Sequence, residues 1–124
     1  MKKYFVNYNQ ALALKELGFD EPCLGVYAEG SKQLIINNTI RNWNDQLKNG
    51  NTTSAPLRSQ VFEWFRKNHS IHSIVSYYGK GQWNIEILDY KGNELIQIED
   101  NTFWSYEEAE SACIDKLIAV CHDK

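Results

Sequence analysis

The second half of the chain contains three β-like runs that are separated by short glycine-containing breaks. The runs read HSIVSYY, QWNIEILDY and ELIQIE, and the breaks are GKG at 79–81 and KGN at 91–93. In the middle run, Trp83, Ile85 and Ile87 alternate with polar residues, which is typical of a strand with one buried face. Because both breaks have turn-forming compositions, the pattern predicts a three-stranded antiparallel meander.

Helical patterns lie on both sides of the predicted meander. Upstream, Ser54 is a suitable N-cap, Pro56 suits a first turn, and the apolar residues that follow recur at helical spacing. Downstream, Ser105 and Glu108 form a capping-box pattern ahead of a broad apolar stripe. The sequence therefore predicts two helices here, and we expect helices on one face of the sheet.

The first 36 residues combine a helix pattern with two short apolar runs. Residues 8–17 have helical spacing between Asn7, as the N-cap, and Gly18, as the stop. The runs LGVYA and QLIIN then flank a short turn that contains glycine. This order predicts one helix followed by a β-hairpin.

A polar stretch separates this hairpin from the next helix. Residues 37–54 are rich in asparagine, threonine and serine, so we expect a variable loop. Within it, Ile40, Trp43 and Leu47 have the spacing of one helical turn, which would place Trp43 against the domain. The stretch is the part of the chain that we expect to be most mobile.

The combined order of elements predicts an α+β fold. We expect an antiparallel sheet, made of the hairpin and the three-stranded meander, with helices packed on one face. A length of 124 residues suits a single domain over 1–124. Its parts are the N-terminal helix and hairpin at 1–36, the polar loop at 37–54, and helix, three strands and helix at 55–124.

The charge and hydropathy of the chain exclude some classes of partner. Thirteen basic and sixteen acidic residues give a net charge of −3, so the composition favours neither nucleic acid nor anionic lipid as a partner. No run approaches the roughly 20 apolar residues of a membrane helix, and the start MKKYFVNYNQ becomes polar too early for a secretory signal. We therefore expect a cytoplasmic protein with no membrane partner.

Few residues suggest metal binding or catalysis. His69, His72, Cys121 and His122 could form a four-ligand zinc site if their segments meet, but the spacing fits no standard zinc motif. Cys23 is a candidate nucleophile, although a lone cysteine is more often a small buried apolar residue. The chain has no P-loop, no nucleophile elbow and no zinc-protease motif. We expect no metal, no cofactor and no enzymatic activity.

Three segments resemble a group of small uncharacterised proteins that are common in bacteriophages, prophages and mobile elements. The segments are ALALKELGFDEPCLGVY, APLRSQVFEWFRKNHSI and SYEEAESACIDKLI, and the similarity covers most of the chain apart from 37–54. That family carries no established activity or catalytic residues. The resemblance implies a cytoplasmic accessory protein of phage type.

The order of elements from Ser54 onward also resembles a double-stranded-RNA-binding domain, which has a helix, three strands and a final helix. Such domains contact phosphates through lysines at the start of the last helix. Here the matching stretch at 106–110 reads YEEAE, and the six acidic residues between Glu99 and Asp115 are accompanied by no lysine or arginine. Because phosphate contacts supply most non-specific affinity, the departure disfavours RNA binding.

Exposed aromatic and acidic residues make a protein-interaction module the leading hypothesis, with an unknown protein partner and self-association as a homodimer. The strand-like runs LGVYA and HSIVSYY offer sheet edges for pairing between copies. The alternative is a nucleic-acid-binding protein. The candidate interaction surface is Trp43, Tyr78, Trp104, Glu107, Glu108 and Glu110. The alternative nucleic-acid contacts are Arg58, Arg66, Lys67 and Lys80.

Overall fold

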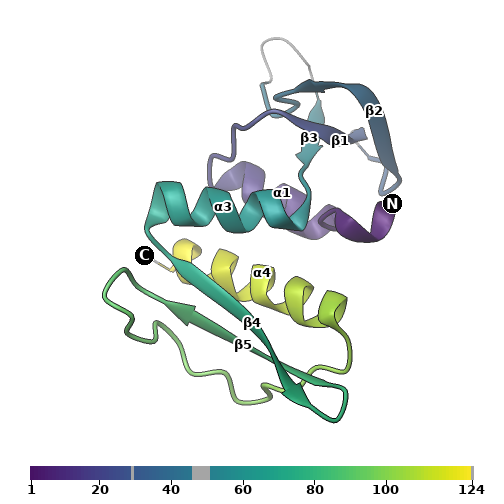
Figure 1. The fold of residues 1–124 in the computed structure, drawn as a ribbon. Helices are drawn as coiled ribbons and strands as arrows, with labels where there is room; N and C mark the ends of the chain where they lie inside the picture. The colour runs from purple at the N-terminus through teal and green to yellow at the C-terminus, as the bar shows by residue number, and fades with distance from the viewer. Residues whose placement is uncertain (29, 46–50, 124) are drawn as a thin grey trace. The chain divides into compact units, whose positions relative to one another are not determined.

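The computed structural model describes residues 1–28, 30–45 and 51–123 (Figure 1). In these residues helices combine with two antiparallel sheets, so the predicted α+β class is confirmed. The chain divides into two compact units, Met1–Arg58 and Ser59–Lys124, and each unit contains one sheet. That all of 1–124 forms a single domain stays a prediction. The elements in order are η1 (Lys2–Tyr4), α1 (Tyr8–Glu16), β1 (Cys23–Ala28), β2 (Leu34–Arg41), β3 (Thr52–Ala55), α3 (Arg58–His69), β4 (His72–Gly79), β5 (Gln82–Leu88) and α4 (Tyr106–His122).

The first helix of the first unit confirms the sequence prediction. Asn7 caps α1 by accepting a hydrogen bond from the backbone N–H of Gln10 at 2.8 Å, and the Gln10 side chain accepts from the Asn7 N–H at 3.0 Å. The helix ends at Leu17, and Gly18 follows with a φ of 94°. Glycine reaches this backbone region without steric cost, which explains why the helix stops there.

The first unit contains a three-stranded sheet in the order β2-β1-β3, with antiparallel pairing throughout. The predicted hairpin is confirmed as β1 and β2. The run LGVYA was expected to supply a sheet edge, and this was wrong because β1 is the central strand. Gly25 is required at its centre, since a Cβ there would collide with the carbonyl oxygen of Ala55 and with the Phe5 ring.

The prediction of a loop over 37–54 was wrong at both of its ends. β2 continues to Arg41, and β3 occupies Thr52–Ala55, where Thr53 and Ser54 are buried against β1. Ser54 is therefore a strand residue and not a helix cap, and α3 begins at Arg58. Pairing with β1 holds Thr52–Ala55 as a regular strand, although the polar composition of this segment had suggested a loop. The predicted helical turn at 40–47 lies partly outside the described residues.

The second unit is built around the antiparallel hairpin of β4 and β5. Val75 lies opposite Ile85, so alternating residues of both strands share one face. Ile85 and Ile87 on that face are buried, and Figure 1 shows α4 lying along the sheet. Ser105 caps α4 by accepting from the Glu108 N–H at 3.1 Å. The apolar α4 side chains buried in the core are Ala109, Cys113, Ile114, Leu117 and Cys121.

The predicted third strand of the meander does not form. Beyond β5, residues 89–104 contain only isolated bridges, such as Trp83 with Phe103 and Leu88 with Glu94. A side chain takes the place of a strand: the Asn101 carboxamide accepts from the Ile85 N–H at 2.8 Å and donates to the Ile85 carbonyl at 2.9 Å. The second unit thus has two strands between its helices, one fewer than a double-stranded-RNA-binding domain.

Among the described residues, no helix has both the length and the apolar composition that a membrane crossing requires.

Candidate interaction site

The most prominent surface feature of the second unit is a cluster of three aromatic rings, Tyr77, Trp83 and Tyr106, with exposed Trp104 two residues before Tyr106. We call these four residues the aromatic tip. Tyr77 ends β4, Trp83 begins β5, and Tyr106 opens α4. The Tyr77 and Trp83 ring centroids are 5.0 Å apart with planes at 60°, and those of Trp83 and Tyr106 are 5.1 Å apart at 75°. These ring contacts, one tilted and one edge-to-face, connect three secondary-structure elements in one cluster.

Local hydrogen bonds hold the aromatic tip in place. The Tyr77 hydroxyl accepts from the Gly81 N–H at 3.0 Å, which fixes the ring over the β4–β5 turn. Trp83 and Phe103 exchange backbone hydrogen bonds of 2.8 and 2.9 Å, so the chain that leads into Trp104 is tied to β5. Lys80 in the turn has a positive φ of 57°. The rings therefore stand on a hydrogen-bonded frame.

Much of the aromatic surface is open to solvent. The exposed fractions are 59% for Tyr77, 65% for Trp104 and 43% for Tyr106. Tyr78 is 73% exposed at the same end of the sheet, where the register between β4 and β5 shifts between Tyr77 and Gly79. Centroid distances near 5 Å leave no gap between the rings, so a ligand would lie across their outer faces.

Two of the three glutamates of the candidate interaction surface lie next to these rings in the sequence. Glu107 and Glu108 lie in the first turn of α4, next to Tyr106, where negative charge also favours the helix dipole. Glu108 is exposed and Glu107 is partly exposed. Glu110 is buried, with 8% of its surface accessible, and so does not share their exposed surface.

Trp43 belongs to the first unit and has a local packing role. Its indole N–H donates to the carbonyl of Cys23 at 2.9 Å, and its backbone N–H donates to the Ser54 hydroxyl at 2.9 Å. The Arg41 guanidinium lies 4.9 Å from the ring centroid. These contacts attach the segment after β2 to β1 and β3, as expected for a Trp43 that lies against the domain.

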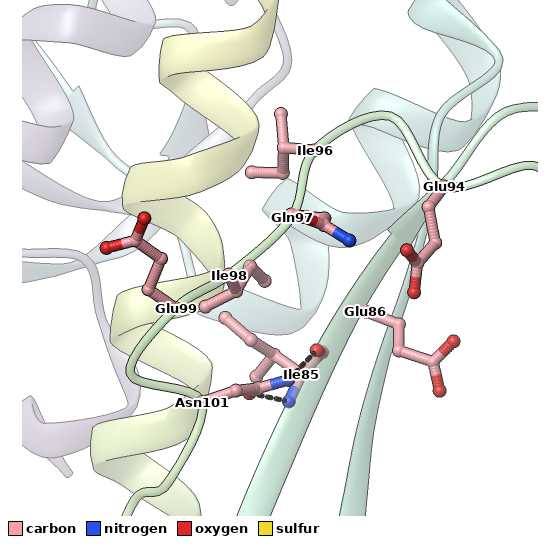
Figure 2. Close-up of a pocket in the computed structure, with 8 residues that line it drawn as sticks. All are labelled: Ile85, Glu86, Glu94, Ile96, Gln97, Ile98, Glu99 and Asn101. Carbon is pink, nitrogen blue, oxygen red and sulfur yellow. Dashed lines mark hydrogen bonds between the residues drawn. The ribbon is translucent and has the colours of Figure 1, made fainter.

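A pocket of about 340 Å³ lies beside the outer edge of β5 (Figure 2). Figure 2 shows the Asn101 carboxamide directed at the Ile85 backbone, with Glu99 on the far side from Glu86 and Glu94. The pocket is the space that remains where residues 94–101 cover β5 without forming a strand. Its lining is Ile85, Glu86, Glu94, Ile96, Gln97, Ile98, Glu99 and Asn101.

The structure does not gather the four basic residues of the alternative hypothesis. Arg58 is buried, with 7% of its surface accessible. The Lys67 ammonium lies 2.6 Å from the Glu63 carboxylate on the solvent side of α3, near exposed Arg66. Lys80 follows the far end of β4, about 25 Å of extended strand away from the end of α3.

The cysteines and histidines of the described residues do not form a reactive or metal-binding site. Burial raises the pKa of the Cys23 thiol, and burial raises the pKa of Cys113 to about 12, so both thiols stay protonated at neutral pH. Cys121 is also buried. In the part of the chain that the structure describes, no three His, Cys, Asp or Glu residues are placed to hold a metal ion.

Comparisons with other proteins give no guide to the site. No protein-family model matches the chain, and neither the curated proteins nor the solved structures gave a match. Sequence reasoning selected Tyr78 and Trp104 but missed the contribution of Tyr77, Trp83 and Tyr106 to the exposed cluster. The available signal was the concentration of aromatics around the GKG turn; the missing information was the pairing that brings the start of α4 to that turn.

Proposed function

We propose that this chain is a non-enzymatic protein-interaction module that binds a protein partner through the aromatic tip. The proposal retains the expectation of a cytoplasmic accessory protein of phage type, which comes from the family resemblance. The observation that supports it is the solvent exposure of the aromatic tip, in which Tyr77, Trp83 and Tyr106 are already fixed by ring contacts with one another.

Preformed aromatic surfaces are energetically suited to binding. Large rings bury much apolar area, and rings that are already ordered lose little conformational freedom when a partner arrives. Here Tyr77 and Trp83 are held by the β4–β5 turn, so the binding surface exists before contact. The carboxylates of Glu107 and Glu108 beside it favour a partner surface that carries arginine or lysine.

The test is a capture experiment from a lysate of the native host, with the tagged full chain as bait. Trp104→Ala and Tyr78→Ala remove exposed rings at the tip end of the sheet, whereas Tyr90→Ala is the matched control, since Tyr90 is 72% exposed outside this region. We expect a specific protein to be retained by the wild type and by Tyr90→Ala, and at least tenfold less of it by Trp104→Ala. Equal retention by all variants would contradict a role for the aromatic tip.

The nucleic-acid alternative is separated in the same experiment by dividing the sample with and without nuclease. Lys80 in the turn beside Tyr77 is the one observation that favours it, because bases stack on aromatic rings near a basic group. Retention that is lost after nuclease treatment, together with a steep dependence on salt, would support nucleic-acid binding and contradict the protein-interaction proposal.

A further inference from the structure

The two edges of the β4–β5 sheet differ in whether the rest of the second unit pairs with their backbone groups. On β5, the outward backbone groups of Trp83 pair with Phe103, and those of Ile85 pair with the Asn101 side chain. The Ile87 carbonyl accepts from the Leu95 N–H at 2.9 Å. The outer edge of β5 is therefore closed by residues 94–103 of the same chain.

The register of the hairpin shows which backbone groups the other edge presents. Because Ile85 directs its N–H and carbonyl away from β4, the opposed residue Val75 directs its own groups away from β5. Ser73 and Tyr77 share the orientation of Val75 by alternation. Among the described residues of the second unit, β5 is the only strand that pairs with β4. Its outer edge is thus a row of backbone donors and acceptors without a strand neighbour.

The side chains along this edge carry no charge that would repel the same strand of a second copy. The stretch from Ser73 to Gly79 contains no Asp, Glu, Lys or Arg. Natural edge strands are commonly protected from pairing by a lysine, a proline or a bulge. In β4 the one irregularity lies at its end, between Tyr77 and Gly79, so the stretch from His72 to Tyr77 keeps a regular register.

We propose that β4 pairs antiparallel with β4 of a second copy of this chain, about a two-fold axis at Val75. In this register, Val75 lies opposite its own counterpart, and Ser73 lies opposite Tyr77 of the second copy. All three are residues whose backbone groups point outward, so each opposed pair exchanges both of its hydrogen bonds. The product is a four-stranded sheet in the order β5-β4-β4-β5, and the inference does not depend on the aromatic tip.

The arrangement leaves room for both α4 helices. A two-fold axis perpendicular to the sheet keeps the two α4 helices on the same face. Each helix then covers its own pair of strands, and two strands at a spacing of about 4.8 Å match a helix diameter of about 10 Å. The opposite face would carry Ile74 beside Ser76 of the second copy, which covers part of an isoleucine that is 42% exposed.

The edge strand β2 of the first unit is less suited to this role. In the first unit, β2 pairs Ile36 with Gly25 and Arg41 with Cys23, so its register slips between these pairs. Such an irregularity twists a strand edge and interrupts the spacing of its backbone groups. We therefore assign self-association to β4 and not to β2.

Measurement of the solution mass provides the first test. Light scattering during gel filtration should give twice the chain mass of 14.4 kDa at high concentration, with dissociation on dilution. Val75→Pro removes an outward N–H and leaves the bonds to β5 intact, which is where an edge strand tolerates proline. We expect this variant to be monomeric with an unchanged circular dichroism spectrum. A wild type that is monomeric at all concentrations would overturn the proposal.

Cross-linking tests the register without disturbing the fold. Ile74 and Ser76 of two copies form a non-hydrogen-bonded pair with a Cα distance of about 4.5 Å, close enough for a disulfide. A mixture of Ile74→Cys and Ser76→Cys chains should therefore cross-link under oxidising conditions, and either chain alone should cross-link at least tenfold less. Equal cross-linking of each chain with itself, or a dimer that forms no mixed disulfide, would overturn the pairing about Val75.

Discussion

The two edges of one hairpin show two ways in which a strand edge can be used. β5 is closed by residues 94–103, yet those residues do not form a strand: one side chain, Asn101, satisfies both backbone groups of Ile85. β4 has the regular register and the uncharged composition of an edge that can accept another strand. The difference shows that edge protection does not require a regular strand, since a few well-placed polar groups are sufficient.

The largest loss of stability should come from a proline at a β4 position whose backbone N–H points toward β5. Ser76 directs its backbone groups toward β5, opposite Asn84, whereas Val75 directs them outward. Ser76→Pro removes a bond within the hairpin and leaves an acceptor unpaired, so we expect the free energy of unfolding to fall by about 3 kcal/mol. Urea denaturation followed by circular dichroism measures this change.

Val75→Pro is the matched control for that variant. Because its missing N–H points away from β5, we expect a loss of less than about 1 kcal/mol in the free energy of unfolding, measured at a concentration where the wild type is monomeric. Similar losses for both proline variants would contradict the assignment of inner and outer backbone groups.

A smaller effect should follow when the closed edge of β5 is opened. Asn101→Ala removes two hydrogen bonds to the Ile85 backbone, and we expect the free energy of unfolding to fall by about 2 kcal/mol. The matched control is Asn93→Ala, because the Asn93 side chain makes one long contact of 3.5 Å to Asp89 at an exposed site. Equal stability of the two alanine variants in urea denaturation would show that the Asn101 bonds do not close the edge.

The helix that covers the sheet, α4, can be destabilised while both edges of the sheet are left unchanged. Ser105→Ala removes the N-cap of α4, so we expect a loss of about 1 kcal/mol in the free energy of unfolding. The solution mass at saturating concentration should not change, because β4 keeps its outer edge. Thermal unfolding and light scattering measure the two quantities, and a monomeric Ser105→Ala protein would link self-association to the helix instead of the strand.

The smallest effect concerns pH and the thiol beneath the sheet. Burial raises the pKa of Cys113 from 9.0 to about 12, while the Ser73 hydroxyl acts in the opposite direction. Since the folded state holds the proton more tightly, the stability due to this thiol is complete below pH 9 and is lost as pH rises from 9 toward 12. The stability difference between wild type and Cys113→Ala should therefore stay constant from pH 7 to 8.5 and shrink at pH 10.5. A difference that already changes below pH 8.5 would contradict the burial of this thiol.

The sequence predicted those elements whose signals are local. The capping residues Asn7 and Ser105, the GKG turn and the alternation in β5 identified two helices and the β4–β5 hairpin. Strand β3 was missed because Thr53 and Ser54 gain their strand character from pairing with β1, which lies far away in sequence. The segment ELIQIE was predicted as a strand because its pattern is strand-like, and nothing local reveals that Asn101 takes its place.

The candidate site was predictable only in part. Trp104 and Tyr78 were among the aromatics expected to be exposed, and both are exposed. Glu110 was grouped with its neighbours, but helical periodicity turns it into the buried side of α4. Tyr77 and Trp83 are cross-strand partners in the predicted hairpin. Tyr106 was not recognised as their neighbour, because it follows the bridge between Trp83 and Phe103, which connects positions twenty residues apart.

Amide hydrogen exchange tests the comparison of the two edges most directly. Exchange is measured residue by residue for dilute protein and again for concentrated protein. We predict that the amides of Ser73, Val75 and Tyr77 exchange rapidly when dilute and become protected at high concentration, while those of Trp83 and Ile85 are protected in both samples. Protection of the three β4 amides in the dilute monomer, or rapid exchange at Ile85, would contradict the account.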